Sequence, residues 1–468
     1  MIAAIVYQER LSFLLRGPAL VAVALTLLAV LYAGWSGDRW RDSRLQSVRA
    51  FESEALASLS DWRDDLVAIE QGKTDASPFD ANPMSISFPA VLPPAPLADF
   101  AVGHADLHPA SADISPWRNG ANVFGRYQFD NPSMLAAAAF DVALVVVVVL
   151  PLLMIAVSFD VLASDRARGS LALVLATPVP LTRLVWTRLA LRNGLLWIAA
   201  VAAMAALFAM NDAGGDRAAR FALWLGVSLA YGLFWFAVIA FCVATVRSSI
   251  GTAAVLVGLW LVLTLAAPAT FATIAEALYP TPSRLAYLSD VREAQGETNR
   301  NLARVTEGYL LDHPELSVGD EGLPAYFRAA YLSNQAARVS TRPVLAAYEN
   351  ARAGRERALD RAQYLSPAIA AQRLLALAAG ADLGRQHRFQ AQVGSALERL
   401  AGAVGPAVVS RSRLTVAQFD ELNPFSFDDE TAPAIARRAF APLGFVLALA
   451  LIVGAVAHRR LASQRLHE

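Results

Sequence analysis

Six long blocks of apolar residues with almost no charge dominate this chain and limit the folds open to it. The blocks cover residues 18–34, 134–158, 189–210, 221–246, 250–273 and 439–457. Each block has about 17 to 26 residues, enough to cross a hydrocarbon core of about 30 Å as a helix. Within lipid a lone backbone segment satisfies its hydrogen bonds only as a helix, which applies even to the valine run 145–149. The composition agrees, because 56% of the residues are hydrophobic and only 17% are charged. The sequence therefore predicts an all-α membrane protein with six transmembrane helices.

The arginines of the short connections predict the orientation of these helices. They gather in the N-terminal stretch 1–17, the loop 159–188 and the tail 458–468, and positive charge favours the cytoplasmic side. Both termini are then cytoplasmic. The two long segments, 35–133 and 274–436, become extracytoplasmic insertions, and the expected location is a bacterial inner (plasma) membrane.

The first apolar block also has the position of a secretory signal peptide. Cleavage requires a small-residue site soon after the apolar stretch, which Ala33-Gly34-Trp35 matches poorly. Glu9 also lies in the region that should be basic. We therefore expect a retained membrane helix.

Both insertions are expected to be mainly helical. Spaced apolar residues among charges predict helices over residues 38–71, 284–312, 324–362 and 367–404. The many prolines of residues 78–116 predict irregular, extended chain instead. Ser366 is expected to cap the helix that begins at Pro367.

The cytoplasmic loop 159–188 contains a segment with a pattern of its own. Asp165 suits a helix start, where the helix dipole favours an acid. Three apolar residues that follow share one helical face, and they are Leu171, Val174 and Leu175. Arg166 and Arg168 are expected near lipid headgroups, and Pro178 ends the helix. The alternative from the residues alone is an ordinary basic loop between two spans.

This segment resembles the signature of ABC-2 type permeases, in which acidic and basic residues precede Gly-Thr-Leu, a leucine-rich turn and Thr/Ser-Pro-Val. The positions that match are Asp165, Arg168, Gly169, Ser170, Leu171, Leu175, Thr177, Pro178 and Val179. Asp165 stands where the family usually has Glu, and Ala167 replaces a second frequent acid, which removes one salt link. The resemblance implies a short helix along the membrane that docks into a groove of a separate ATPase.

Further motifs resemble a branch of these permeases that has large periplasmic insertions of unknown function. They are Phe140-Asp141, Pro151-Leu152, Phe159-Asp160, Leu365-Ser366-Pro367-Ala368, Gln372-Arg373-Leu374, Ala381-Asp382 and His387-Arg388-Phe389. The stretch 2–15 matches the family's interfacial helix ahead of the first span. The resemblance implies a pair of ABC ATPase subunits that bind ATP and Mg²⁺, and a second permease copy or relative.

Asp141 and Pro151 are the two candidates for a translocation path or gate. An acid inside a membrane helix is a functional candidate by default, and Asp141 is expected about one and a half to two turns inside the second span. It could line the path or pair with Arg126, or it could lie close enough to the outer end for water to reach it. Pro151 could kink the helix.

No catalytic or metal site is expected in this chain, and no cofactor. Gly72-Lys73-Thr74 resembles the end of a phosphate-binding loop, but Val67 stands where that loop needs a glycine. His104, Asp106 and His108 have a spacing that could bind a metal, yet they lie in a proline-rich loop, and a solvated loop is the preferred interpretation. A net charge of zero gives no indication of a nucleic-acid partner.

Three functions follow from these patterns. The first is a permease subunit, with export as the expected direction, that couples hydrolysis in a separate ATPase to helix movement. The second uses the same stroke to remodel a periplasmic protein, with no solute crossing. The third is an intramembrane enzyme or sensor, which predicts clustered polar residues at one depth.

Overall fold

Six helical segments of the computed structural model are long and apolar enough to cross a membrane. They are α2 (Gly17–Glu70), α4–η4–α5–α6 (Val142–Leu144, Val145–Val149, Leu150–Ser158, Ala163–Ala167), α8 (Leu181–Ala209), α9 (Gly215–Thr245), α10–η5–α11 (Ser249–Leu261, Val262–Ala266, Ala267–Leu278) and α18 (Ala432–Ser463). This part of the prediction is confirmed. The structure describes residues 6–7, 9, 13, 17–73, 77, 79–103, 108–118, 122–124, 140–167, 169, 180–211, 214–280, 284–300, 302–312, 322–422 and 425–463.

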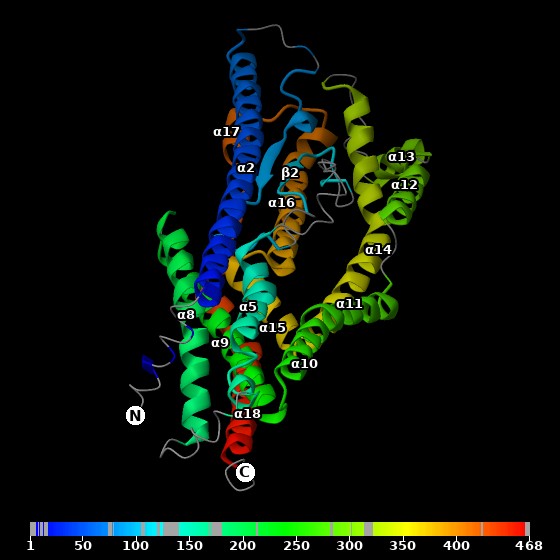
Figure 1. The fold of residues 1–468 in the computed structure, drawn as a ribbon. Coiled ribbons are helices and arrows are strands. Elements are labelled where there is room, and N and C mark those ends of the chain that lie inside the picture. The colour runs from blue at the N-terminus through cyan, green and yellow to red at the C-terminus, as the bar shows by residue number, and fades with distance from the viewer. Residues whose placement is uncertain are drawn as a thin grey trace.

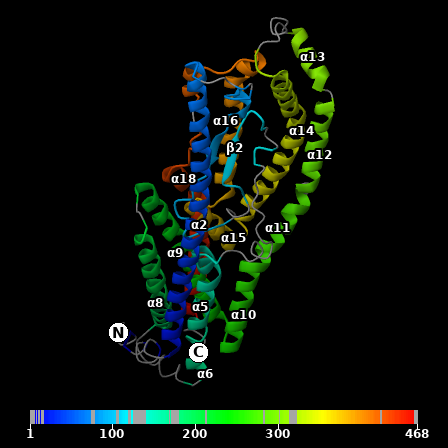
Figure 2. The same ribbon diagram turned by 90° about the horizontal axis from the view of Figure 1, so that it is seen from above.

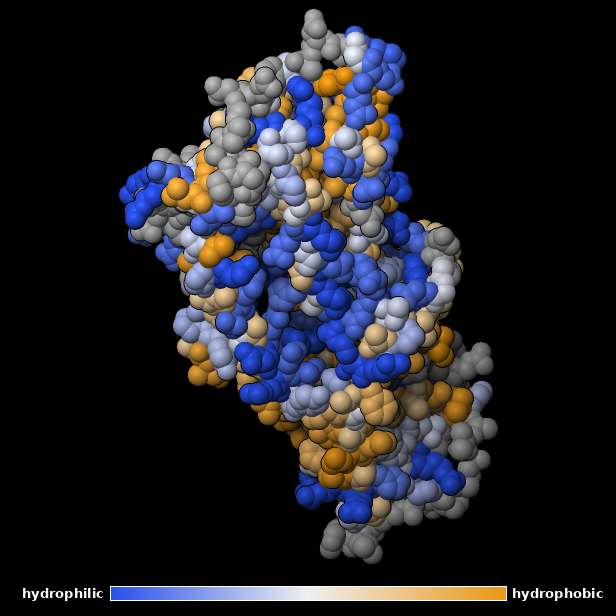
Figure 3. All heavy atoms as spheres, turned by 180° about the vertical axis from the view of Figure 1, so that it is seen from behind, coloured by the Kyte–Doolittle hydropathy of each residue, from blue (hydrophilic) through white to orange (hydrophobic). Residues whose placement is uncertain are grey.

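The six segments form a bundle at one end of an elongated molecule (Figure 1). We call the rest the head; it comprises the second half of α2, the described residues of 71–124, and α12, α13, α14, α16 and α17. We call the opposite end of the bundle, where α2 begins and α18 ends, the base. Apolar side chains cover much of the bundle surface, whereas a polar belt separates it from the head (Figure 3).

α2 crosses the bundle and continues into the head without a break. Its 54 residues extend about 80 Å at about 1.5 Å per residue, far more than one membrane crossing. The prediction of a span at 18–34 followed by a separate helix at 38–71 is therefore wrong about the break. Gly34 and Gly37 instead allow close approach, because a Cβ at Gly37 would lie 2.3 Å from the Asp99 carbonyl oxygen.

α9 is the central helix of the bundle, and α10–η5–α11 lies at its periphery. In its most apolar stretch, 78% of the α9 residues are buried, against 17% for α10–η5–α11. α9 packs against α18 and against α15 (Pro367–Ala379), a short apolar helix that reaches from the head side into the bundle. The core here includes the fully buried rings of Trp224 and Trp235.

Several predicted boundaries shift. α8 and α18 each begin seven or eight residues before the predicted span, and α9 begins six before it. The predicted spans ended short of most arginines, but the structure pairs several of these side chains within the protein, which are Arg188, Arg217, Arg220 and Arg438. In the second span the helix starts at Val142, and residues 134–139 lie outside the described residues.

The head contains the remaining helices and a small sheet. They are η2 (Pro83–Ser85), β1 (Phe88–Val91), β2 (Ser111–Ile114), α12 (Arg284–Arg300), α13 (Leu302–Asp312), α14 (Ala325–Ala362), α16 (Leu383–Val409) and α17 (Val416–Asp420). β1 and β2 pair antiparallel, with Phe88 opposite Ile114, so residues 78–116 hold more regular structure than predicted. α12 packs along α14, as Figure 2 shows.

The helix predicted over 367–404 is two helices. Gly380 has φ 79°, a left-handed conformation that ends α15, and α16 begins after Asp382. Ser366 does precede α15, but its hydroxyl does not cap that helix. It donates instead to the Leu263 carbonyl of the fifth span at 3.1 Å.

Candidate functional site

At the base, the short helix α6 is held against α8 by a partly buried ion pair. Asp165 lies in the first turn of α6, as predicted, and its Oδ2 accepts from Arg188 NH1 at 2.5 Å. The same NH1 donates to the Val161 carbonyl, just before α6, at 3.1 Å. Arg188 is only 6% exposed, so its charge depends on these partners.

One turn further along α8, Arg192 binds the N-terminal segment and the end of α5. Its Nε donates to Glu9 Oε1 at 2.5 Å, and its NH1 donates to Asp160 Oδ1 at 2.8 Å. Its guanidinium also lies 3.9 Å from the centre of the Phe13 ring. Glu9 is 1% exposed and reaches Arg188 Nε at 3.4 Å, so it bridges the two arginines.

We call this group the base lock; it consists of Glu9, Asp160, Asp165, Arg188 and Arg192. Its members come from the N-terminal segment, the α5–α6 connection, α6 and α8. Removing one partner of a buried pair leaves a charge without compensation, at a cost of about 3–5 kcal/mol. The lock therefore joins α6 and the α5–α6 connection, the base end of the second span, to α8, which is the third span.

Of the nine coupling residues predicted from the sequence, the structure describes Asp165 and Gly169. Gly169 has φ +70°, a backbone conformation that favours glycine, so the chain turns there after α6. The other seven lie outside the described residues: Arg168, Ser170, Leu171, Leu175, Thr177, Pro178 and Val179. Contact of this segment with an ATPase stays a prediction. The structure adds that Asp165 has a partner within the chain, Arg188.

Sequence reasoning missed Glu9, Arg188 and Arg192 as a unit. A signal was present, because Arg188 and Arg192 are four residues apart and so share one helix face. Arg192 also lies inside the predicted span 189–210, where a charge marks a partner or a site. What the sequence could not supply is the identity of the acids, since Glu9 is 183 residues away.

Asp141 does not lie inside the second span but caps its start. Its Oδ1 accepts from the Leu144 N–H at 2.8 Å, and its Oδ2 accepts from the Val102 N–H at 3.0 Å. Burial raises the pKa of this carboxyl, against the opposing effect of these N–H donors. The predicted depth is therefore wrong, and Arg126 lies outside the described residues.

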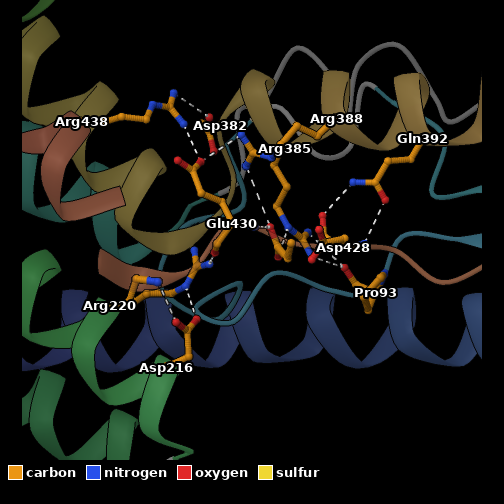
Figure 4. A network of polar contacts seen from close by, with 12 residues as sticks. Pro93, Asp216, Arg220, Asp382, Arg385, Arg388, Gln392, Asp428, Glu430 and Arg438 are labelled. Atoms are coloured by element: carbon orange, nitrogen blue, oxygen red, sulfur yellow. Dashed lines mark hydrogen bonds and ion pairs between the residues drawn. The ribbon is translucent and has the colours of Figure 1, made fainter. Parts of the chain in front are cut away.

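At the head end of the bundle, a second polar network joins α9 to the start of α18 (Figure 4). Arg220 Nε donates to Asp216 Oδ2 at 2.6 Å, and Arg220 NH2 donates to the Glu430 carbonyl. Asp216 Oδ1 also accepts from the Ala432 N–H at 2.8 Å. Arg220 is 1% exposed, so this contact lies at the centre of the junction.

The same network continues into α16 of the head. The Glu430 carboxylate accepts from Arg388 at 3.0 Å and from Arg438 of α18 at 2.7 Å. Arg385 pairs with Asp429 at 2.7 Å and donates to the Pro93 carbonyl at 3.1 Å. We call this group the head lock; it consists of Asp216, Arg220, Asp382, Arg385, Arg388, Asp429, Glu430 and Arg438.

Burial dominates the electrostatics of the head lock. It raises the pKa of the Asp382 carboxyl, although Arg438 and Arg388 oppose the effect. It also lowers the pKa of the Arg385 guanidinium, which Asp429 opposes. Both shifts show charges withdrawn from water and held by one another. A related pair, Arg217 with Asp99 at 2.7 Å, ties α9 to the loop beside α2.

The head also contains a groove between α2 and the sheet. Its volume is about 380 Å³, and its lining includes Phe51, Trp62, Ser87, Trp117 and Arg118. Trp117 is 37% exposed, which leaves aromatic surface accessible. No group of three or more metal-ligating side chains gathers within the described part of the chain, and His104 and Asp106 lie outside it.

One family model matches the chain, over residues 284–428, and it describes a domain of unknown function (DUF3526). The match begins with α12 and ends beyond α17, so it covers much of the head and less than a third of the chain. Comparisons with curated proteins and with solved structures find no match.

Proposed function

We propose that this chain is the membrane-spanning permease subunit of an ABC transporter of the ABC-2 type. Hydrolysis in a separate pair of ATPase subunits, which bind ATP and Mg²⁺, drives movement of its helices, and a second permease copy or relative completes the pore. The six apolar helical segments and the resemblance of residues 165–179 to the ABC-2 signature support this proposal. The proposal also places the protein in the inner membrane, with both termini in the cytoplasm, and gives export as the direction of transport.

The base lock is the observation on which the mechanism depends. An ATPase that grips α6 and the residues after it moves a segment whose acid, Asp165, is paired with Arg188 of α8. Because the lock also includes Asp160 in the α5–α6 connection, one displacement moves the second and third spans together. A loop without such partners would absorb the same displacement.

The proposed orientation is tested by finding on which side of the membrane residue 169, in the turn after α6, is accessible. A Gly169→Cys variant, in a Cys242→Ala background, is treated with a membrane-impermeant maleimide in intact cells and in inverted vesicles. We expect labelling only in inverted vesicles, and the opposite pattern for Leu56→Cys in the head, whose native residue is 50% exposed. Labelling of residue 169 in intact cells would overturn the proposal.

Copurification tests the partner. The chain is purified in mild detergent from its own host, its bound chains are identified, and ATP hydrolysis is measured. We expect an ABC ATPase in the complex, and weaker binding when Asp165→Ala releases α6 from α8. Absence of any ATPase from the intact complex would contradict the proposal.

A second candidate is ATP-driven remodelling of a partner protein on the head side, without solute transport. The continuous α2 and the aromatic groove of the head favour this candidate, because they offer a rigid arm and a place for a partner. Reconstituted vesicles distinguish the two, since only the permease accumulates or releases a solute. The intramembrane enzyme or sensor is disfavoured, because the carboxylate of Asp141 is engaged as a helix cap.

A further inference from the structure

Two of the six spans contain a proline two residues after the end of a π-helical turn. In the second span η4 precedes Pro151, and in the fifth span η5 precedes Pro268. A proline has no N–H to donate, and a π-turn shifts the hydrogen-bond register by one residue. Each span therefore has carbonyl groups without a helical donor in a region where lipid offers none.

In the second span, side chains from two other helices donate to carbonyl groups of the π-helical turn. Pro151 cannot donate to the carbonyl four residues earlier, that of Val147, and Tyr231 Oη of α9 donates to it at 3.2 Å. The next carbonyl, Val148, accepts from Trp260 Nε1 of α10 at 3.1 Å. Trp260 thus links the second span directly to the fifth.

In the fifth span the donor comes from the head side. At the end of η5 the Ala267 N–H bonds to the carbonyl five residues earlier, that of Val262. The next carbonyl in this register, Leu263, would pair with residue 268, which is a proline. Ser366 Oγ, at the start of α15, donates to that carbonyl at 3.1 Å.

We propose that η4 and η5 are hinges, and that Tyr231, Trp260 and Ser366 are positioning residues that set their bend. The second span has its base end in the base lock, and Trp260 connects it to the fifth span. Ser366 then connects η5 of the fifth span to the start of α15. α15 is followed directly by α16, which belongs to the head lock. A displacement of α6 is thereby passed to the head. The hinges and their contacts do not depend on the proposed function; only the ATPase as the source of the displacement rests on it.

A double-mutant cycle tests the assignment at η5. Ser366→Ala removes the donor, and Pro268→Ala supplies a backbone N–H in its place. Hydrogen exchange is measured by mass spectrometry on the purified full-length chain, for peptides covering η5 and α11. We expect Ser366→Ala to speed exchange there about two- to tenfold, and to have little effect in the Pro268→Ala background.

Ser228→Ala is the matched control, because the Ser228 hydroxyl is fully buried in α9 and donates to the Trp224 carbonyl of its own helix. It should leave exchange at η5 unchanged. Equal effects of Ser366→Ala and Ser228→Ala, or an undiminished effect of Ser366→Ala beside Pro268→Ala, would overturn the hinge. Neither result depends on an ATPase, so loss of the hinge and loss of the proposed function are distinguishable.

Discussion

At the scale of single residues, buried arginines mark the points where segments distant in sequence meet. Four of them contact an acid on another segment: Arg188, Arg192, Arg217 and Arg385. A buried charge is costly unless it is paired, so each such contact fixes two segments relative to one another. The acid at Asp141 acts differently, because its partners are backbone N–H groups.

Replacing Arg192 by methionine should lower stability by about 3–5 kcal/mol, because it leaves buried Glu9 without its closest partner. Thermal unfolding in detergent measures the loss. Arg183→Met is the control, since Arg183 lies on the same helix but is exposed. Similar losses in the two variants would show that the base lock has no special role.

Substitutions of Asp141 separate its cap from its charge. Asp141→Asn keeps an acceptor oxygen, whereas Asp141→Ala removes the cap and should cost about 0.5–2 kcal/mol more. Because the folded-state pKa is raised, this carboxyl stabilises the protein below its unfolded value of about 4, and that contribution is lost as pH rises through the folded pKa. Unfolding measured across this range should therefore depend less on pH in Asp141→Asn. An unchanged pH dependence would contradict the assignment.

At the scale of elements, the shape of each helix depends on where it is interrupted and on where it packs closely against a neighbouring segment. η4 and η5 interrupt two spans before a proline, whereas α2 stays continuous through two glycines. The apolar blocks predicted the existence of each span well, because an apolar stretch of about 18 residues is long enough to cross the membrane and is rarely found in other structures. The ends were less predictable, because charged residues extend a helix wherever tertiary partners cover them.

Gly37→Ala should destabilise the protein by about 1–3 kcal/mol, because the new methyl group would meet the Asp99 carbonyl, a backbone atom that cannot move alone. Gly226→Ala in α9 has open space around its Cβ and should be neutral or slightly stabilising. Comparing the two melting temperatures checks the expectation. A stable Gly37→Ala protein would mean that α2 and the Asp99 loop are not closely packed.

At the scale of the whole molecule, polar locks close the apolar bundle at both ends. The base lock joins the N-terminal segment to the second and third spans, and the head lock joins the fourth and sixth spans to α16. The apolar interior between them buries most of the apolar side chains, while the two locks determine which helix ends stay in contact. Motion imposed at one end can therefore reach the other through few connections.

Arg220→Met should loosen the head from the bundle, because the fully buried guanidinium joins α9 to the start of α18. Hydrogen exchange should rise at the first turns of α16 and α18. Arg63→Met is the comparison, since it breaks an exposed pair with Asp420 between α2 and α17, and exposed pairs contribute little. Exchange that rises only at α17 in both variants would argue against the head lock.

The sequence by itself determined the six spans, the helical character of the long insertions and the helix start at Asp165, because each depends on local pattern and on hydrophobicity. Only the tertiary structure decided the partners: Glu9 for Arg192, Asp429 for Arg385, and the Leu263 carbonyl for Ser366. These pairs join residues 183, 44 and 103 positions apart, respectively. No local periodicity specifies which distant donor meets which buried acceptor, since that choice is made by how the helices pack.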